Sequence, residues 1–551
     1  MSIINKSRRI YLGVVSISFI IWSGLFIYRA SFIAIDGKRY FCLLEDAMIS
    51  MRYAWNLSHG LGLVWNPGIR VEGITNMLMT LYMALVTFLF DKITAVLVIQ
   101  FSGIGFMLAI AYFTMKIAGT IFTPERTANR EFLLGLSFTI ALCYFPLVYW
   151  TLMGMETGLL TVLLLGAIWI AIGIGRKPGI KLLLPNLLGL AFLARPDALI
   201  FIAIIIAYRA IGVIKHKKGL VTVLAEAGII GLYVAGLTVF RLGYYGDMVP
   251  NTYTLKISGI PLWFRIKNGW GFVVPFLHSM ALPIVIALLC LVFNFNTIIL
   301  LLMSLFFASL AYQIWTGGDV WSYWRTMSPF IPLLFIVCIQ AVSNIVRSFF
   351  KSKKRFKTGI SPSGGSRVKS LVQKMTIAGI VFLLLIVPDY RFIPQIFLIS
   401  PARGSAKNHK NINQAIAIRQ LTLPGASVAV LEAGVIPYFT GRRAIDMLGK
   451  SDRYIASLPP DLSGAVSWGG MKSVPGHNKY DLRYSLITLR PTYVYAFSWG
   501  RDDLSAFGRE NYRRVQYQGV GIWLLKGSEE VLWQKIWNLK SRKHSILKNP
   551  R

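Results

Sequence analysis

Apolar stretches long enough to cross a lipid bilayer recur along this chain from Ile10 to about Ser400, and most charged residues lie in the short segments between them. The hydrocarbon core of a bilayer is about 30 Å thick, so a spanning helix needs about 20 mainly apolar residues. With 55% hydrophobic residues among 551, the chain is too apolar for a soluble enzyme. It is therefore predicted to be a mostly α-helical polytopic membrane protein.

The formal net charge of +35 fits the same interpretation. In a soluble protein such a charge would suggest nucleic acid binding, because clustered Lys and Arg neutralise phosphates. Here the basic residues gather between the apolar stretches, as is typical of cytoplasmic loops. We therefore predict a cytoplasmic N-terminus and no nucleic acid partner. The main basic clusters lie at 6–9, 176–181, 215–218 and 347–374.

This orientation places residues 36–75 in a first periplasmic loop and residues 401–551 in a domain on the same side. It requires an odd number of crossings, and about eleven fits the length of the membrane segment, residues 1–400. The hydropathy pattern contains one apolar run too many, between Asn76 and Tyr149. One run there is expected to be re-entrant, or two to count as one.

The segment 401–551 is less apolar and reads as a small soluble α/β domain. A helical pattern covers Asn411–Gln420, and short strand-like runs are punctuated by Gly and Pro. The predicted strands are Val428–Leu431, Tyr493–Phe497 and Gly521–Leu525.

Two adjacent carboxylates, Glu45 and Asp46, stand at the start of the first periplasmic loop. A helix over Cys42–Ser58 would place Asp46 on one face and Glu45 with Arg52 on the neighbouring face. The pair could cap or solvate an interfacial helix. A carboxylate there could instead act as a general base or stabilise an oxocarbenium-like centre in glycosyl transfer.

A second polar group, RLGYYGDMVPNTYTLK, runs from Arg241 to Lys256 and contains Tyr244, Tyr245 and Asp247. Interfacial cations can bind the phosphate of a lipid that stays in the membrane. The alternative is an aromatic belt with cations that reach toward the bilayer surface.

A third group, WTGGDVWSYWR, holds Asp319, Trp324 and Arg325 after a Gly-Gly turn. Aromatic rings beside charges are typical of a sugar-binding wall, although a plain interfacial girdle has the same composition. His477, in PGHNKYD, could be a surface residue or part of a site. Arg195 and Asp197 could neutralise each other at a helix end.

Several common catalytic signatures are missing from the sequence. It has no glycine-rich nucleotide loop, no HExxH helix and no Ser-His-Asp signature. These absences argue against chemistry driven by ATP or by nucleotide sugars. No cofactor and no metal ligand are predicted, and the use of a divalent metal stays open.

The motifs together resemble a known family. The segment 45–76, the YYGDMVPNTY loop, the GGD followed by Trp324-Arg325, EAGVIPYFTGRRAIDMLGKSDRYIA at 432–456 and PGHNKYD are similar to the AftB-type terminal arabinofuranosyltransferases of the GT-C class. Two departures are Met51, where an aromatic residue is expected, and Lys450-Ser451, where Leu-Asn is expected. These departures leave the acceptor open.

The resemblance implies a GT-C membrane core, a periplasmic α/β domain and a polyprenyl-phosphate-linked pentofuranose as donor. It also implies that Asp46 is the key catalytic carboxylate, supported by Glu45. The other implied contacts are Arg52, Arg241, Lys256 and Arg325 with the donor phosphate, and Tyr244, Tyr245, Asp247, Asp319, Trp324 and His477 with the sugar or acceptor.

The expected function is an integral glycosyltransferase of a bacterial inner membrane that passes arabinofuranose from a polyprenyl-phosphate donor to a periplasmic cell-envelope glycan. One alternative is a GT-C transferase with another lipid-linked sugar and a pilin-like protein or lipopolysaccharide acceptor. Another is a flippase for lipid-linked sugars, but transporters often show repeat symmetry, which the sequence lacks. The stereochemistry of transfer stays open.

Overall fold

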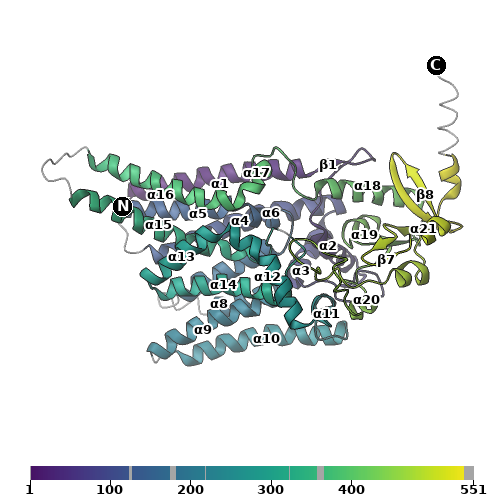
Figure 1. Cartoon of the computed structure of the whole chain (residues 1–551), viewed down its shortest axis with the longest axis horizontal. Helices are drawn as coiled ribbons and strands as arrows, with labels where there is room; N and C mark the ends of the chain where they lie inside the picture. Colours follow the sequence, from purple (N-terminus) through teal and green to yellow (C-terminus); the bar gives the residue numbers. More distant parts are fainter. Residues whose placement is uncertain are drawn as a thin grey trace, which may run out of the picture.

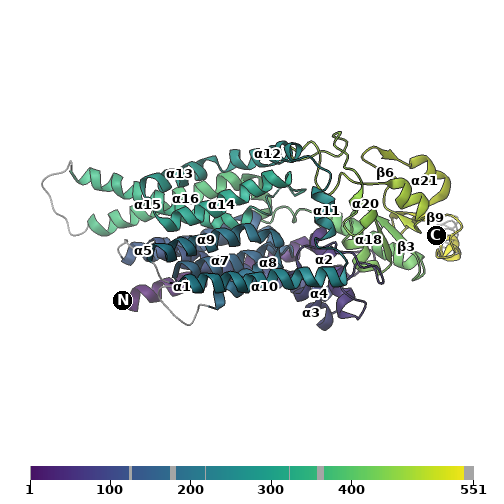
Figure 2. The same ribbon diagram turned by 90° about the horizontal axis from the view of Figure 1, so that it is seen from below.

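The computed structural model describes residues 2–122, 127–173, 182–216, 219–321, 323–355 and 365–538. The molecule is elongated, and most of its length is a bundle of helices that run along its long axis (Figure 1). The N-terminus lies at one end of the bundle, and a smaller unit that contains a β-sheet lies at the other end (Figure 1). The same separation is visible after a turn of 90° (Figure 2).

Long apolar helices form the bundle. Within the described residues, seven helical segments are long and apolar enough to cross a membrane. This finding confirms the prediction of a mostly α-helical polytopic membrane protein. The helices concerned are α1 (Ser2–Ala30), α4 (Lys92–Ile121), α9 (Leu199–His216) with the short turn before it, α10 (Leu220–Tyr244), α14 (Thr297–Thr316), α15 (Ile331–Arg355) and α16 (Gly365–Asp389).

Two further crossings can be built from bent pairs of helices. The pair α5 (Thr127–Cys143) and α6 (Phe145–Leu152) bends by 56°, and the pair α12 (Leu262–Ser279) and α13 (Ala281–Phe293) bends by 81°. Pro146 stands in the first turn of α6, where its missing N–H costs the helix no hydrogen bond. The predicted number of about eleven crossings requires that the shorter helices α7 (Thr157–Gly173) and α8 (Leu183–Ala194) cross as well.

One apolar run between Asn76 and Tyr149 forms a short helix, α3 (Met77–Leu89). Its 13 residues span about 20 Å, which is less than the hydrocarbon core. It packs against α2 (Glu45–Ser58), at the end of the bundle that carries the C-terminal unit (Figure 1). The helix α8, with 12 residues, is as short, so which run between Asn76 and Tyr149 is the extra one stays a prediction.

The first loop contains a small hairpin of β1 (Phe32–Ile33) and β2 (Arg39–Tyr40), followed by α2. The helix begins at Glu45, three residues later than the Cys42 start that the sequence predicts. Gly62 then adopts a φ of +89°, and a Cβ there would lie 2.6 Å from the Tyr244 hydroxyl. Only glycine therefore lets this loop pass so close to the end of α10.

The C-terminal unit has a five-stranded mixed sheet with the strand order β4-β3-β5-β9-β8. Strand β3 pairs in parallel with β4 and β5, whereas β9 is antiparallel to β5 and β8. The predicted helix and all three predicted strands are present, with ends shifted by a few residues. The α-helices and strands of the unit are α18 (Ser405–Leu421), β3 (Ser427–Val430), α19 (Val435–Thr440), β4 (Arg443–Asp446), α20 (Arg453–Ser457), β5 (Tyr493–Val494), β6 (Ser498–Trp499), β7 (Asp502–Asp503), α21 (Ser505–Asn511), β8 (Tyr512–Tyr517) and β9 (Val520–Leu525).

Arg52 on α2 joins the first loop to the C-terminal unit. Its buried guanidinium donates to the carbonyls of Trp65 and Arg442, at 2.6 and 2.7 Å, and to the carbonyl of Pro437. It also donates to Oδ1 of Asn66 at 3.1 Å. The planar fork of arginine suits several acceptors in fixed directions.

Replacing Arg52 should therefore loosen the junction between the bundle and the C-terminal unit. Each carbonyl left buried without a donor costs about 1–3 kcal/mol. We expect Arg52→Ala to lower the apparent Tm of the purified protein by several degrees, while Lys38→Ala, at an exposed turn, leaves it unchanged. Equal melting of both variants and the wild type would contradict this role.

Candidate functional site

A cavity of about 500 Å³ lies where the bundle meets the C-terminal unit. Its walls come from α2, α8, α9, α10, the short helix α11 (Asn251–Ile257), α14 and the loop that follows β4. Part of the lining is apolar, from Phe192, Leu199, Ile200, Val234, Ile257 and Trp315. The rest is charged, so the cavity is amphipathic.

Asp46 lies in the charged part of this cavity. Its carboxylate accepts hydrogen bonds from Arg325 and from the indole N–H of Trp321, both at 3.0 Å, and forms an ion pair with Lys450. Burial alone would raise the pKa of Asp46, but Lys450 and Arg325 hold that pKa well below its usual range. The carboxylate is therefore ionised at neutral pH.

Lys450 comes from the C-terminal unit, on a turn that is fixed from two sides. The buried carboxylate of Asp446 accepts backbone N–H bonds from Leu448, Gly449 and Ser451 at 2.7–3.1 Å. From the bundle side, the Asn251 amide donates to the carbonyls of Gly449 and Lys450, at 2.8 and 2.9 Å. The ammonium of Lys450 is thus held over Asp46 by a rigid turn.

Lys256 contributes a further cation to the same cavity. Among the described residues, no carboxylate lies within 4.0 Å of its ammonium and no hydrogen-bond acceptor binds it. Burial lowers the pKa of Lys256, while Asp319 and Asp46 act in the opposite direction. An anion that entered the cavity would find this ammonium available.

The remaining charged residues of the cavity are paired. Arg325 bridges from Asp46 to Asp319, at 3.0 and 3.2 Å. Arg195 binds Asp197 through two hydrogen bonds of 2.6 and 2.8 Å, as the ion-pair alternative predicts, and also contacts Glu156 at 2.8 Å. The charged side chains around Asp46 therefore have oppositely charged partners, whereas Lys256 has none within 4.0 Å among the described residues.

Arg241 also lines the cavity, and one edge of its guanidinium faces a carboxylate. It forms two hydrogen bonds of 2.8 and 3.0 Å with the buried carboxylate of Glu72. The carbonyl of Glu72 in turn accepts the backbone N–H of Asn251 at 3.0 Å. Arg241 therefore ties the first loop to the start of α11, close to Lys256.

The side chains of the adjacent residues Glu45 and Asp46 point in different directions and bind different partners. Glu45 is outside the cavity lining and accepts the N–H groups of Gly434 and Val435, each at 3.0 Å, and the Asn411 amide at 2.8 Å. Arg52, expected beside the pair and at the donor phosphate, instead holds the carbonyls described above. Both residues dock α2 onto the C-terminal unit and do not line the cavity.

Five other predicted site residues lie outside the cavity lining. The hydroxyls of Tyr244 and Tyr245 bind the backbone of Leu63 at 2.9 and 2.8 Å. The other three are Asp247, in an exposed ion pair with Arg453, Trp324, packed edge-on against Phe276, and His477, between Trp468 and Trp499. Most of these side chains therefore brace the loops that frame the site.

Three residues at the site were missed by sequence reasoning: Lys450, Trp321 and Glu72. In the sequence, Lys450 stood out only because Leu is expected there, and no pattern indicated that its side chain would contact Asp46. Trp321 stood inside a motif that the sequence singled out. Within the described ranges, no three His, Cys, Asp or Glu side chains gather in a way that could hold a metal ion.

Comparisons with known proteins agree with this architecture. A family described as a domain of unknown function (DUF8728) matches residues 405–537. The terminal beta-(1->2)-arabinofuranosyltransferase of Mycobacterium tuberculosis is 24% identical over 260 residues, which are 44% of this chain and 39% of that protein. The match thus covers well under half of the relative.

Two solved structures share the arrangement of helices. ArnT from Cupriavidus metallidurans bound to undecaprenyl phosphate superposes with a TM-score of 0.50 at 9% identity, over 95% of this chain and 98% of ArnT. The oligosaccharyltransferase of Archaeoglobus fulgidus gives 0.51 at 9% identity, over 95% and 75% of the two chains. The chain therefore has the GT-C fold, and the resemblance indicated by its motifs is confirmed.

His477 generates a pH prediction. Burial and the nearby Lys450 lower the pKa of His477 to about 3, below the value of about 6.5 expected in the unfolded chain. Its neutral form therefore contributes stability above pH 6.5 that is lost as the pH falls toward 3. We expect the free energy of unfolding to fall between pH 7 and pH 5 by on the order of 1 kcal/mol more for the wild type than for His477→Gln, and the Tm of the wild type to fall further accordingly. Parallel Tm profiles would contradict the lowered pKa.

Proposed function

We propose that this chain is an integral membrane glycosyltransferase that transfers a sugar, arabinofuranose, from a polyprenyl-phosphate donor to a cell-envelope glycan on the periplasmic face. One observation carries the proposal: the ionised Asp46 shares an amphipathic cavity with Lys256, a cation that has no carboxylate partner among the described residues. The apolar lining suits a lipid, and the cation suits its phosphate.

One comparison supports the class of donor, and another supports the sugar. ArnT shares the fold and was solved with undecaprenyl phosphate bound. The relative from Mycobacterium tuberculosis is named for arabinofuranosyl transfer. We extend the lipid-linked donor to this chain from the fold and the cavity, and the pentose from the motifs and this relative.

The donor's first isoprene units would lie along the apolar wall formed by α8, α9, α10 and α14. Its phosphate would then reach Lys256, which is near the polar end of that wall. It could also accept a hydrogen bond from the Nε of Arg325. The Nε of Arg325 is buried and has no hydrogen-bond partner within the described ranges. Arg241 positions this region through Glu72, which accepts its Nε and one Nη.

Transfer replaces one bond at the anomeric carbon by another. The acceptor oxygen forms a bond to this carbon, the bond from the carbon to the phosphate oxygen breaks, and the polyprenyl phosphate leaves with the electron pair. An ionised Asp46 is suited to take the acceptor's proton or to stabilise positive charge at the anomeric centre. Asp319 lines the same cavity and shares Arg325 with Asp46, and we propose that it contacts the sugar.

The C-terminal unit is proposed to be periplasmic and to contribute to the acceptor site. Its Lys450 reaches the cavity directly, so the unit forms part of the site's wall. Glu45 and Arg52 hold it against the first loop. An acceptor chain bound along this unit would have its end close to Asp46.

Replacing Asp46 by Asn should abolish transfer while the protein still inserts into the membrane. The amide keeps the shape of the side chain but lacks the negative charge, and a carboxylate in acid–base catalysis contributes about 10²–10⁴-fold. We expect mass spectrometry of envelope glycans and pilins from cells that carry only Asp46→Asn to match that of cells lacking the gene.

Glu510→Gln is the matched control, because Glu510 is an exposed carboxylate on α21. It should restore the wild-type glycans. Full restoration by Asp46→Asn would refute the catalytic assignment. A modified pilin, or a hexose in place of a pentose, would refute the proposed acceptor or sugar and leave the role of Asp46 intact.

A further inference from the structure

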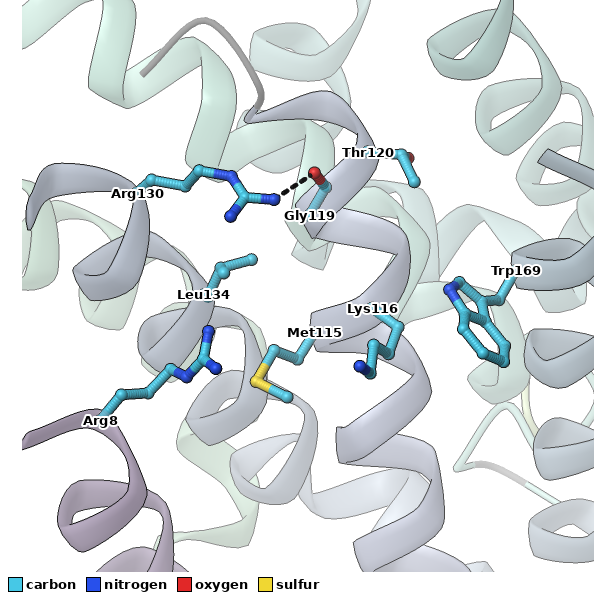
Figure 3. A pocket seen from close by; sticks show the side chains of 8 residues that line it. All are labelled: Arg8, Met115, Lys116, Gly119, Thr120, Arg130, Leu134 and Trp169. Atoms are coloured by element: carbon cyan, nitrogen blue, oxygen red, sulfur yellow. Dashed lines mark hydrogen bonds between the residues drawn. The ribbon is translucent and has the colours of Figure 1, made fainter. Parts of the chain in front are cut away.

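A second cavity, of about 250 Å³, lies at the opposite end of the bundle from Asp46. It is formed by the beginning of α1, the last turns of α4, the beginning of α5 and the end of α7, which places it near the N-terminus (Figure 1). Figure 3 shows three basic side chains, Arg8, Lys116 and Arg130, around this hollow, with Trp169 at its edge.

Two of the cations are directed into the protein by contacts between helices. Arg8 on α1 binds the carboxylate of Glu131 on α5 at 2.6 Å. Arg130 on α5 donates to the carbonyl of Gly119 on α4 at 2.9 Å (Figure 3). Basic side chains that only extend to the bilayer surface would turn away from neighbouring helices toward water.

The positive charge of this cavity is not balanced. Within the described ranges, Glu131 is the single carboxylate within 4.0 Å of Arg8, Lys116 or Arg130. Lys116 lies in the apolar helix α4 and contacts the rings of Tyr112 and Trp169, at 5.1 and 5.9 Å from their centroids. The Nε of Arg8 is buried and has no hydrogen-bond partner among the residues that the structure describes.

Uncompensated cations at the end of a membrane helix are costly unless an anion joins them. We infer that this cavity binds the phosphate headgroup of an anionic membrane lipid, between α1, α4, α5 and α7. Basic pockets between membrane helices on the cytoplasmic side are suited to such headgroups. Lys116 and Arg130 would hold the phosphate. The exposed apolar side chains of Ile10 and Val14, which follow Arg8 on α1, would contact the acyl chains.

This site is separate from the proposed donor cavity. The two cavities share no lining residue and lie at opposite ends of the bundle. The lipid bound here would therefore be a constituent of the other leaflet and not the sugar donor. Its binding would fasten α1 to α4 and α5 and add stability to the bundle, because a ligand of the folded state shifts the unfolding equilibrium.

Native mass spectrometry of the purified full-length chain tests this site, with phosphatidylglycerol, phosphatidylcholine and inorganic phosphate as separate probes. We expect phosphatidylglycerol to be retained and to raise the Tm, and the other two to do neither. The double variant Lys116→Gln with Arg130→Gln should bind phosphatidylglycerol more weakly by on the order of tenfold. Lys116→Arg keeps the charge and should bind as the wild type does.

Lys38→Gln is the control for loss of charge, because Lys38 is exposed at the far end of the bundle. It should retain the lipid fully. Equal retention of phosphatidylglycerol by the double variant and the wild type would overturn the proposal, provided that both melt alike in phosphatidylcholine. Binding of inorganic phosphate as tight as that of the lipid would overturn the lipid assignment and indicate a site for a soluble anion.

Discussion

The ion pairs of Asp46 connect the three parts of this molecule. The carboxylate belongs to the first loop, Arg325 belongs to the bundle, and Lys450 belongs to the C-terminal unit. Taking a carboxylate out of water is costly, and the cost is offset when opposite charges and hydrogen bonds surround it. The two cations and Trp321 meet that requirement only when all three parts are assembled. The site therefore forms together with the fold.

The surrounding contacts explain how this arrangement is kept. Glu45 and Arg52 fasten α2 to the C-terminal unit, and Asp446 with Asn251 fixes the turn that carries Lys450. All four groups are buried; Glu45, Arg52 and Asn251 bind partners from another segment of the chain, and Asp446 binds the backbone of its own turn. Such a network favours one arrangement of the first loop, the bundle and the C-terminal unit, because a shift of one part against another would leave several buried polar groups unpaired. Among the described residues that line the cavity, Lys256 is a cation without a carboxylate partner and is available to a ligand.

Local patterns made much of the fold predictable, because the length of apolar runs and the short strands are local properties. The positions of α18, β3 and β9 followed from such patterns, and Asp46, Lys256 and Arg325 lay in motifs that the sequence singled out. The directions of side chains depend on distant segments and could not be predicted. Adjacent residues Glu45 and Asp46 face different partners, and Lys450 meets Asp46 from more than 400 residues away.

We propose that Lys256 and Arg325 hold the phosphate of a polyprenyl lipid beside Asp46. A structure of the full-length chain determined by electron cryomicroscopy in lipid nanodiscs with added undecaprenyl phosphate tests it most directly. We expect the phosphate within hydrogen-bond distance of both cations, with the prenyl chain along α10 and α14. A phosphate bound elsewhere on the protein, with Lys256 free of it, would contradict the proposed donor site.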